Sequence, residues 1–125
     1  MYKRQHPYFE QISELQVSSH LLIERNGSII QFVPFDKKAW HAGISKFQGR
    51  ENCNEFSIGI ELEGTDNLDY TTNQYESLVE ATKEIMKVYP AISKENIVGH
   101  SDIAPDRKTD PGDSFNWNLY LHNLV

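Results

Sequence analysis

The side chains most suited to catalysis or metal binding gather in one segment of the chain, residues 99–112. This segment lies between a short apolar run and a Pro-Gly turn, and its ionisable residues are His100, Asp102, Asp106, Arg107, Lys108 and Asp110. Imidazole nitrogens and carboxylate oxygens are usual zinc ligands, and a catalytic zinc keeps three protein ligands with a fourth position for water. The segment could therefore supply two ligands, His100 and Asp110.

Two further residues could act beside such a metal. Lys108 precedes Asp110 by two positions, so both side chains point the same way if the segment is extended, and the ammonium group could stabilise a developing oxyanion. Glu61 follows Gly59 on the polar face of an expected strand and has the character of a general base. Glu63 shares that face, and the spacing leaves the choice between the two glutamates open.

Each candidate also has an ordinary structural interpretation. A histidine beside a proline-rich loop is often a hydrogen-bonded structural residue, and this applies to His100. Lys108 and Asp110 could form a surface ion pair, and Glu61 could be a solvated strand residue. Residue types and spacing alone do not decide between these interpretations and catalysis.

The segments that must position these residues begin with β patterns. Residues 17–33, VSSHLLIERNGSIIQFV, contain two β-rich runs around Asn26-Gly27, which predicts a hairpin. In residues 56–63, apolar residues alternate with polar residues and a glycine, which predicts a strand with two unlike faces. The candidate base, Glu61, lies on the polar face of this strand.

A helical pattern follows these strands. Apolar residues recur at helical spacing across residues 75–89, with a capping signal at Thr71 and Gln74 and a stop at Pro90. Residues 97–98, Ile-Val, predict a short strand that leads into a loop too rich in Pro, Gly and Asp to be regular. Strands, one long helix and further short strands predict a mixed α/β fold.

The composition limits the classes of protein to consider. A chain of 125 residues is the size of one domain, so residues 1–125 are expected to form a single domain around one core. The net charge is -6 and the basic residues are scattered, which argues against nucleic acid and acidic membranes as partners. The sequence has no run of apolar residues that predicts a membrane span or signal peptide, and its single cysteine, Cys53, excludes an internal disulfide. These features predict a cytoplasmic protein.

Four motifs resemble the zinc-dependent N-acetylmuramoyl-L-alanine amidases of the AmpD type. In chain order they are VSSHLLIERNGSI, FVPFDKKAWHAGISKFQGRE, FSIGIELEGTD and GHSDIAPDRKTDPG. They occur in the same order as in the family, and the match runs from about residue 6 to residue 117. The resemblance implies a mixed central β-sheet flanked by helices. It also implies a hydrolase that cleaves the amide between the lactyl group of N-acetylmuramic acid and L-alanine in 1,6-anhydromuropeptides, during peptidoglycan recycling.

The resemblance assigns roles to the candidate residues. It implies that His100 and Asp110 bind Zn²⁺, that Lys108 stabilises the tetrahedral intermediate, and that Glu61 rather than Glu63 is the base or water-positioning group. No organic cofactor is implied, and the expected partner is the anhydromuropeptide substrate of a monomeric enzyme.

Further residues match the family at the substrate groove. Trp40 and His41, in AWHAG, match a segment where an indole could cover sugar or lactyl carbons, although a tryptophan in the core is an equal alternative. Ala104 matches the binding wall through its backbone. His20 is expected to be a structural histidine, or one that orients a ligand, rather than a ligand itself.

The match also implies a difference from the family. The first zinc ligand of the family is a histidine near the end of an N-terminal central strand, upstream of the segment that matches His6, and we expect this chain to lack that strand. The expectation is a weak or inactive amidase. The alternatives are an endolysin-type peptidoglycan amidase and a non-catalytic module that binds muropeptides.

Overall fold

The computed structural model describes residues 19–39, 41–42, 45–64, 68–106 and 108–124. The described strands form a three-stranded sheet and a separate two-stranded sheet. In chain order the strands are β1 (Leu21–Ile23), β2 (Ile29–Gln31), β3 (Lys46–Phe47), β4 (Arg50–Glu51) and β5 (Ile60–Leu62). The helices are the 3-10 turns η1 (Cys53–Glu55) and η2 (Lys94–Asn96) and the α-helices α2 (Thr72–Val88), α3 (His100–Ile103) and α4 (Trp117–His122).

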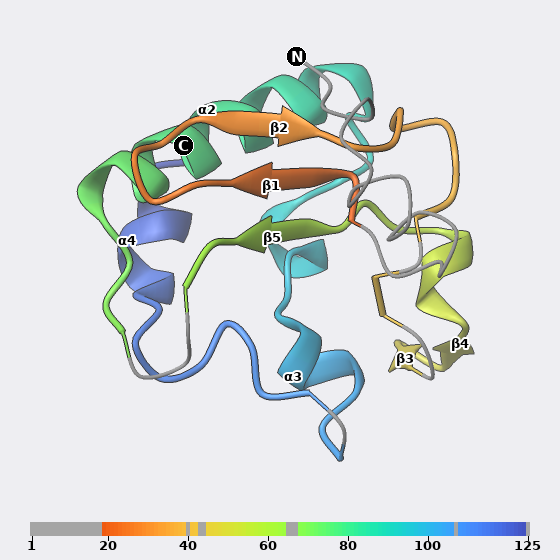
Figure 1. Ribbon diagram of the computed structural model, residues 1–125. Helices are drawn as coiled ribbons and strands as arrows, with labels where there is room; N and C mark the ends of the chain where they lie inside the picture. The colour runs from red at the N-terminus through yellow and green to blue at the C-terminus, as the bar shows by residue number, and fades with distance from the viewer. Residues whose placement is uncertain (1–18, 40, 43–44, 65–67, 107, 125) are drawn as a thin grey trace, which may run out of the picture.

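The larger sheet has the order β2-β1-β5 and is mixed (Figure 1). β1 runs antiparallel to β2, with Leu22 opposite Ile30, and parallel to β5, with Leu22 opposite Glu61. The predicted hairpin is confirmed, and Gly27 adopts a positive φ of 92° in its turn, a region that glycine enters without a steric penalty. The strand predicted for residues 56–63 is shorter than expected: only residues 60–62 form a strand.

Helices α2 and α4 pack on the same side of this sheet, behind it in the view of Figure 1. The buried cluster that joins the two layers consists of Ile23, Leu78, Phe115, Tyr120 and Leu124. The ring of Phe115 stacks on that of Tyr75 with 5.4 Å between centroids and meets the Trp117 ring edge-on at 4.9 Å. These aromatic contacts tie the segment that follows the candidate loop to the long helix.

The start of α2 is fastened to two strands through one buried side chain, Gln74. The predicted capping box is confirmed: Thr71 Oγ1 accepts from Gln74 N at 3.1 Å, and Gln74 Oε1 accepts from Thr71 N at 3.0 Å. The carboxamide nitrogen of Gln74 donates to the carbonyl oxygens of Ile23 at 3.2 Å and Glu63 at 2.9 Å. Gln74 therefore holds the helix start against the carboxyl ends of β1 and β5.

Two local predictions are wrong. Residues 97–98 do not form a strand, because the N–H of Ile97 closes the preceding 3-10 turn on the carbonyl of Lys94 at 3.2 Å and no described strand pairs with them. The segment after Gly99 is not wholly irregular, since residues 100–103 form one helical turn. The carboxylate of Asp102 caps that turn by accepting from Gly99 N at 2.8 Å, a stabilisation that composition alone does not reveal.

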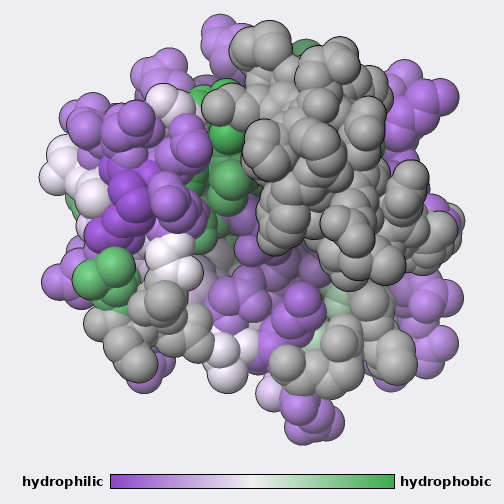
Figure 2. All heavy atoms as spheres, viewed as in Figure 1, coloured by the Kyte–Doolittle hydropathy of each residue, from purple (hydrophilic) through white to green (hydrophobic). Residues whose placement is uncertain are grey.

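The surface is mainly hydrophilic on the face seen in Figure 2, where hydrophobic side chains appear only in separate places. Among the described residues, no helix is both long enough and apolar enough to cross a membrane.

The role of Gln74 gives a first prediction, on stability. The variant Gln74→Ala removes the carboxamide donor to the Glu63 carbonyl and the acceptor of the N-cap amide, and it takes one of two donors from the Ile23 carbonyl, so the free energy of unfolding should fall by about 2–4 kcal/mol. Glu76→Ala is the matched control, because Glu76 lies in the same turn and is exposed, and it should change stability by less than about 0.5 kcal/mol. Urea unfolding of both variants makes the comparison, and equal stabilities would contradict the role given to Gln74.

Candidate metal centre

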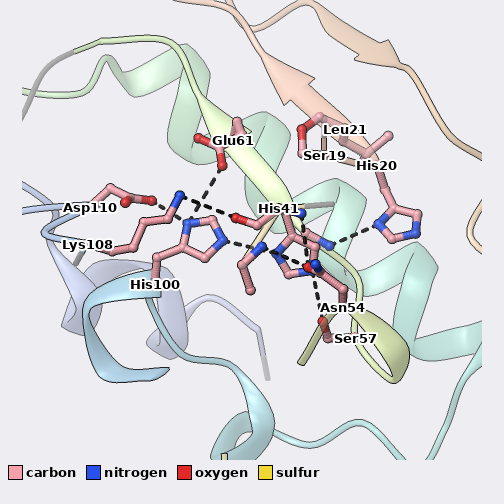
Figure 3. Close-up of polar contacts among 12 residues, drawn as sticks. Ser19, His20, Leu21, His41, Asn54, Ser57, Glu61, His100, Lys108 and Asp110 are labelled. Carbon is pink, nitrogen blue, oxygen red and sulfur yellow. Dashed lines mark hydrogen bonds and ion pairs between the residues drawn. The ribbon is translucent and has the colours of Figure 1, made fainter. Parts of the chain in front are cut away.

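The candidate residues come from three separate parts of the chain and meet beside β5, where Glu61, His100, Lys108, Asp110 and His41 lie together (Figure 3). Glu61 lies in β5, His100 begins α3, and Lys108 and Asp110 follow in the loop after that turn. His41 comes from the connection between β2 and β3. Residues that spacing alone could not connect therefore share one site.

Glu61, His100 and Asp110 each offer a ligand atom, and these atoms lie within 4.8 Å of one another. His100 Nδ1 is 2.5 Å from Asp110 Oδ2 and 3.7 Å from Glu61 Oε2. The imidazole is 9% exposed, whereas the carboxyl side chains are 41% (Glu61) and 39% (Asp110) exposed. Imidazole nitrogen and carboxylate oxygen are both atoms that bind zinc, so this group could hold a metal ion.

This donor set fits a metal ion with small adjustments. Zinc bonds of about 2.1 Å in tetrahedral geometry place neighbouring ligand atoms about 3.4 Å apart. The separation of His100 Nδ1 and Glu61 Oε2, 3.7 Å, is close to this value. The contact between His100 and Asp110 is a direct hydrogen bond, and it would have to lengthen by about 0.9 Å to admit a metal between the two groups.

His100 is placed by the backbone of its own loop. Ser101 N donates to the carbonyl oxygen of Asp110 at 3.0 Å, which brings the two candidate ligands together. Gly99 lies so close to Pro111 that a Cβ at position 99 would stand 2.7 Å from Pro111 Cδ. The loop therefore closes on itself only because residue 99 has no side chain.

The environments of the two carboxyl groups shift their pKa values in opposite directions. Burial raises the pKa of Glu61, with His100 as a weaker opposing influence. The hydrogen bond from His100 lowers the pKa of Asp110. An ionised carboxylate suits a metal ligand, and a carboxyl group with a raised pKa suits proton transfer.

Lys108 lies at the candidate centre, whereas Glu63 lies away from it. The ammonium group of Lys108 lies 3.5 Å from the carbonyl oxygen of His41 and faces the same space as Asp110 (Figure 3). The exposed side chain of Glu63 instead accepts from Arg25 N at 2.8 Å. The geometry thus brings Glu61, and not Glu63, to the candidate centre.

His41 is buried, with 8% exposure, and its ring contacts His100. Its Nδ1 lies 3.0 Å from His100 Nε2, and its Nε2 lies 2.8 Å from Ser57 Oγ. Burial is the main cause that lowers the pKa of His41 to about 3, and the electrostatic influence of the neighbouring His100, His20 and Lys108 side chains acts in the same direction. The ring is therefore neutral near pH 7.

The other predicted substrate residues have different positions. Trp40 lies outside the described residues. Ala104 is 5% exposed, and its backbone N–H donates to the carbonyl of His100 while its carbonyl accepts from Lys108 N, both at 2.9 Å. The substrate-binding roles of Trp40, His41 and Ala104 stay predictions.

His20 is fully buried and joins the sheet to two loops. Its Nδ1 accepts from Gly59 N at 3.1 Å, and its Nε2 donates to the carbonyl of Lys37 at 2.7 Å. Both ring nitrogens therefore contact backbone groups, which agrees with the structural role expected for it. Burial lowers its pKa, against the raising effect of the Lys37 carbonyl.

A cavity of about 560 Å³ opens beside the candidate centre. Its polar end includes His41, Glu61, His100 and Asp110, and the rest of its wall is largely apolar. This combination of an apolar wall and a few convergent polar groups is typical of sites that bind small ligands.

Sequence reasoning did not identify two polar residues of the site. Asn54 Oδ1 accepts from His41 N at 3.0 Å and from Ala42 N at 2.8 Å. Ser57 Oγ contacts the His41 ring. The one signal in the sequence was indirect. A glycine inside a strand pattern, here Gly59, often marks a close approach by another group, and that group is the His41 ring, which Ser57 contacts.

The chain belongs to the N-acetylmuramoyl-L-alanine amidase family, whose model matches residues 1–113. The family resemblance of its motifs is thereby confirmed. Within the family it is similar to 1,6-anhydro-N-acetylmuramyl-L-alanine amidase AmpD of Escherichia coli (strain K12), with 62% identity over 112 residues, or 90% of this chain and 61% of the relative. AmpD of Haemophilus influenzae is 58% identical over 119 residues, or 95% of this chain and 65% of the relative. The chain thus spans about three fifths of the length of these relatives.

Solved structures of amidases share the fold. The crystal structure of a Se-Met AmpD derivative matches with a TM-score of 0.86 and 57% identity over 97% of this chain and 67% of that one. The amidase AmiD from E. coli, in complex with anhydro-N-acetylmuramic acid-L-Ala-D-gamma-Glu-L-Lys, matches with a TM-score of 0.79 and 36% identity over 98% of this chain and 54% of that one. The predicted α/β class with a mixed central sheet and flanking helices is confirmed.

The burial of His20 predicts how stability depends on pH. Its pKa in the folded state lies below the unfolded value of 6.5, so below about pH 6.5 the unfolded chain binds a proton that the folded chain does not. The free energy of unfolding should therefore fall as the pH drops from about 7.5 to about 5. In His20→Gln that fall should be smaller, although the variant should be about 1–3 kcal/mol less stable at the higher pH.

Urea unfolding at both pH values measures this effect. His41 contributes a fall of the same sign in both proteins, so the difference between the two slopes isolates His20. Identical slopes for the two proteins would show that His20 does not remain neutral in the folded state.

Proposed function

We propose that this chain carries the catalytic centre of a zinc-dependent amidase that hydrolyses the bond between the lactyl group of N-acetylmuramic acid and L-alanine in 1,6-anhydromuropeptides. The observation that supports this most is the group of Glu61, His100 and Asp110, which lies close to Lys108 and lines part of a cavity. The relatives at 58–62% identity are 1,6-anhydro-N-acetylmuramyl-L-alanine amidases, which supports the substrate class. The process is peptidoglycan recycling.

The charge and position of each residue indicate its role in the proposed reaction. His100 and Asp110 would hold the metal, since one is a nearly buried imidazole and the other a carboxylate with a lowered pKa. When bound, zinc polarises the amide carbonyl and makes water a nucleophile near neutral pH. Glu61 takes a proton from the attacking water and passes it to the leaving amine of L-alanine. The Lys108 ammonium stabilises the negative charge that develops on the carbonyl oxygen.

The cavity supports the choice of ligand. Its apolar wall suits the lactyl and sugar carbons, and its polar end presents the reacting groups to the amide. We propose a monomer in the cytoplasm, a compartment compatible with the free, buried Cys53.

Metal dependence and substrate choice are tested together on the purified 125-residue chain. Zinc should raise the midpoint of thermal unfolding, because a ligand at 100 times its Kd stabilises the folded state by about 2.7 kcal/mol. It should also support slow release of the stem peptide from a soluble anhydromuropeptide, in line with the weak amidase expected from the sequence, followed by mass spectrometry, and a chelator should abolish both effects. His100→Ala and Asp110→Ala should lose them, whereas His122→Ala, at an exposed histidine outside the site, should keep them.

The alternatives give different results in the same assay. Cleavage of insoluble sacculi in preference to the soluble substrate indicates an endolysin-type amidase. Binding of the anhydromuropeptide in calorimetry without any cleavage indicates a non-catalytic module. Either result contradicts the proposed activity.

The roles of base and ligand for Glu61 are separated by comparing turnover with metal affinity. As a base, Glu61→Gln should lower kcat by about 10²–10⁴-fold and leave the Kd for zinc within about threefold. As a ligand, the same change should weaken zinc binding by far more than that, since a metal centre needs its full set of donors. Glu63→Gln is the matched control, because Glu63 contacts Arg25 outside the centre, and it should leave both quantities unchanged. A large loss of zinc affinity in Glu61→Gln would reassign this residue as a ligand.

A further inference from the structure

A chain of hydrogen bonds leads away from the metal side of His100 into the protein. His100 Nε2 lies 3.0 Å from His41 Nδ1, and His41 Nε2 lies 2.8 Å from Ser57 Oγ (Figure 3). Ser57 Oγ in turn lies 2.5 Å from the carbonyl oxygen of Cys53. The chain joins one candidate ligand to a backbone group through two side chains to which the proposed reaction gives no role.

The direction of each hydrogen bond follows from the last member. A carbonyl oxygen can only accept, so the single hydrogen of the Ser57 hydroxyl points to Cys53. The hydrogen between Ser57 and His41 must then belong to His41 Nε2. An imidazole that carries its hydrogen on Nε2 has a lone pair on Nδ1, and at 3.0 Å this lone pair accepts the Nε2–H of His100. The donors therefore run in one direction, from His100 to His41 to Ser57.

This order selects the nitrogen of His100 that faces the candidate centre. With a hydrogen held at Nε2 by His41, Nδ1 is the ring atom directed at Asp110 and Glu61. A ring flip would break the contact with His41 and remove Nδ1 from the two carboxylates.

His41 itself is fixed on several sides. Asn54 Oδ1 accepts from its backbone N–H at 3.0 Å. Its carbonyl oxygen lies 3.5 Å from Lys108 Nζ. Its ring lies against Gly59, where a Cβ would stand 2.3 Å from His41 Cγ. The ring can occupy this place only because residue 59 has no side chain.

We propose that His41 is a positioning residue for the metal centre, which accepts the Nε2–H of His100 and, anchored by Ser57, holds Nδ1 of His100 toward Glu61 and Asp110. Ligand histidines usually donate their second N–H to a carboxylate, a carbonyl or water, whereas here the acceptor is a second imidazole. The part of this proposal that concerns zinc affinity rests on the proposed function, but the hydrogen-bond order does not.

The hydrogen-bond order is tested first, without metal, by nitrogen NMR of the histidine rings in the whole chain. His41 should carry its hydrogen on Nε2, and a coupling through the hydrogen bond should connect His100 Nε2 with His41 Nδ1. A hydrogen on His41 Nδ1 would overturn the proposal whether or not the chain binds zinc.

The effect on the metal is tested with a matched pair of variants at position 41. His41→Leu keeps much of the side-chain volume but has no acceptor, so the Kd for zinc, measured by competition with a chromophoric chelator, should rise by about 10–100-fold. His41→Asn places a carboxamide oxygen where Nδ1 was, and its zinc affinity should stay within about threefold of the parent. Ser57→Ala should fall between the two, because it removes the anchor of His41 but not the acceptor.

Unfolding midpoints of the metal-free variants show whether the fold is intact. Equal zinc affinities for His41→Leu and His41→Asn, with both folded, would overturn the positioning role. An increase in KM without a change in zinc affinity would also overturn it, and would favour the substrate-binding role predicted from the sequence. If the parent chain binds no zinc, the proposed function fails, and the NMR result alone decides the hydrogen-bond order.

Discussion

The close approach of an imidazole ring to the backbone at Gly59 is the constraint on which the rest of the site depends. On one side of this residue the ring of His41 fills the space that a Cβ would need. On the other side the amide of Gly59 donates to the ring of His20, and its carbonyl accepts from the N–H groups of His20 and Leu21. Two buried histidines are thus aligned on the residue that leads into β5, the strand that carries Glu61.

The arrangement of the groups around His100 follows from which hydrogen bonds each ring nitrogen can form. One imidazole, His100, lies between a carboxylate on its Nδ1 side and a neutral imidazole on its Nε2 side. The carboxyl groups of Asp110 and Glu61 therefore have unlike surroundings, one hydrogen-bonded and the other mainly desolvated, and their pKa values move apart. Such divergence within a few ångströms allows two carboxyl groups to perform two different roles at one pH.

The frame that carries these groups is fastened by polar as well as apolar contacts. Phe115, which follows the candidate loop, packs against the long helix. Gln74 at the start of that helix binds the carboxyl ends of β1 and β5 through its carboxamide. The strand with Glu61 and the loop with Asp110 are therefore held to the same helix, which explains how short strands can support a site whose atoms must stay within a few ångströms.

The sequence by itself determined the local elements whose signals lie within a few residues: the hairpin around Gly27 and the helix capped by Thr71 and Gln74. Its motifs also determined the family and the candidates in residues 99–112. The spacing left the choice between Glu61 and Glu63 open, because both fit the same alternating pattern, and the resemblance to the family selected Glu61. The tertiary structure decided the contacts that Glu61 makes, with its Oε2 3.7 Å from His100 Nδ1. It also decided the contact of His41 with His100, since residues 59 positions apart are brought together by packing, for which no local pattern exists.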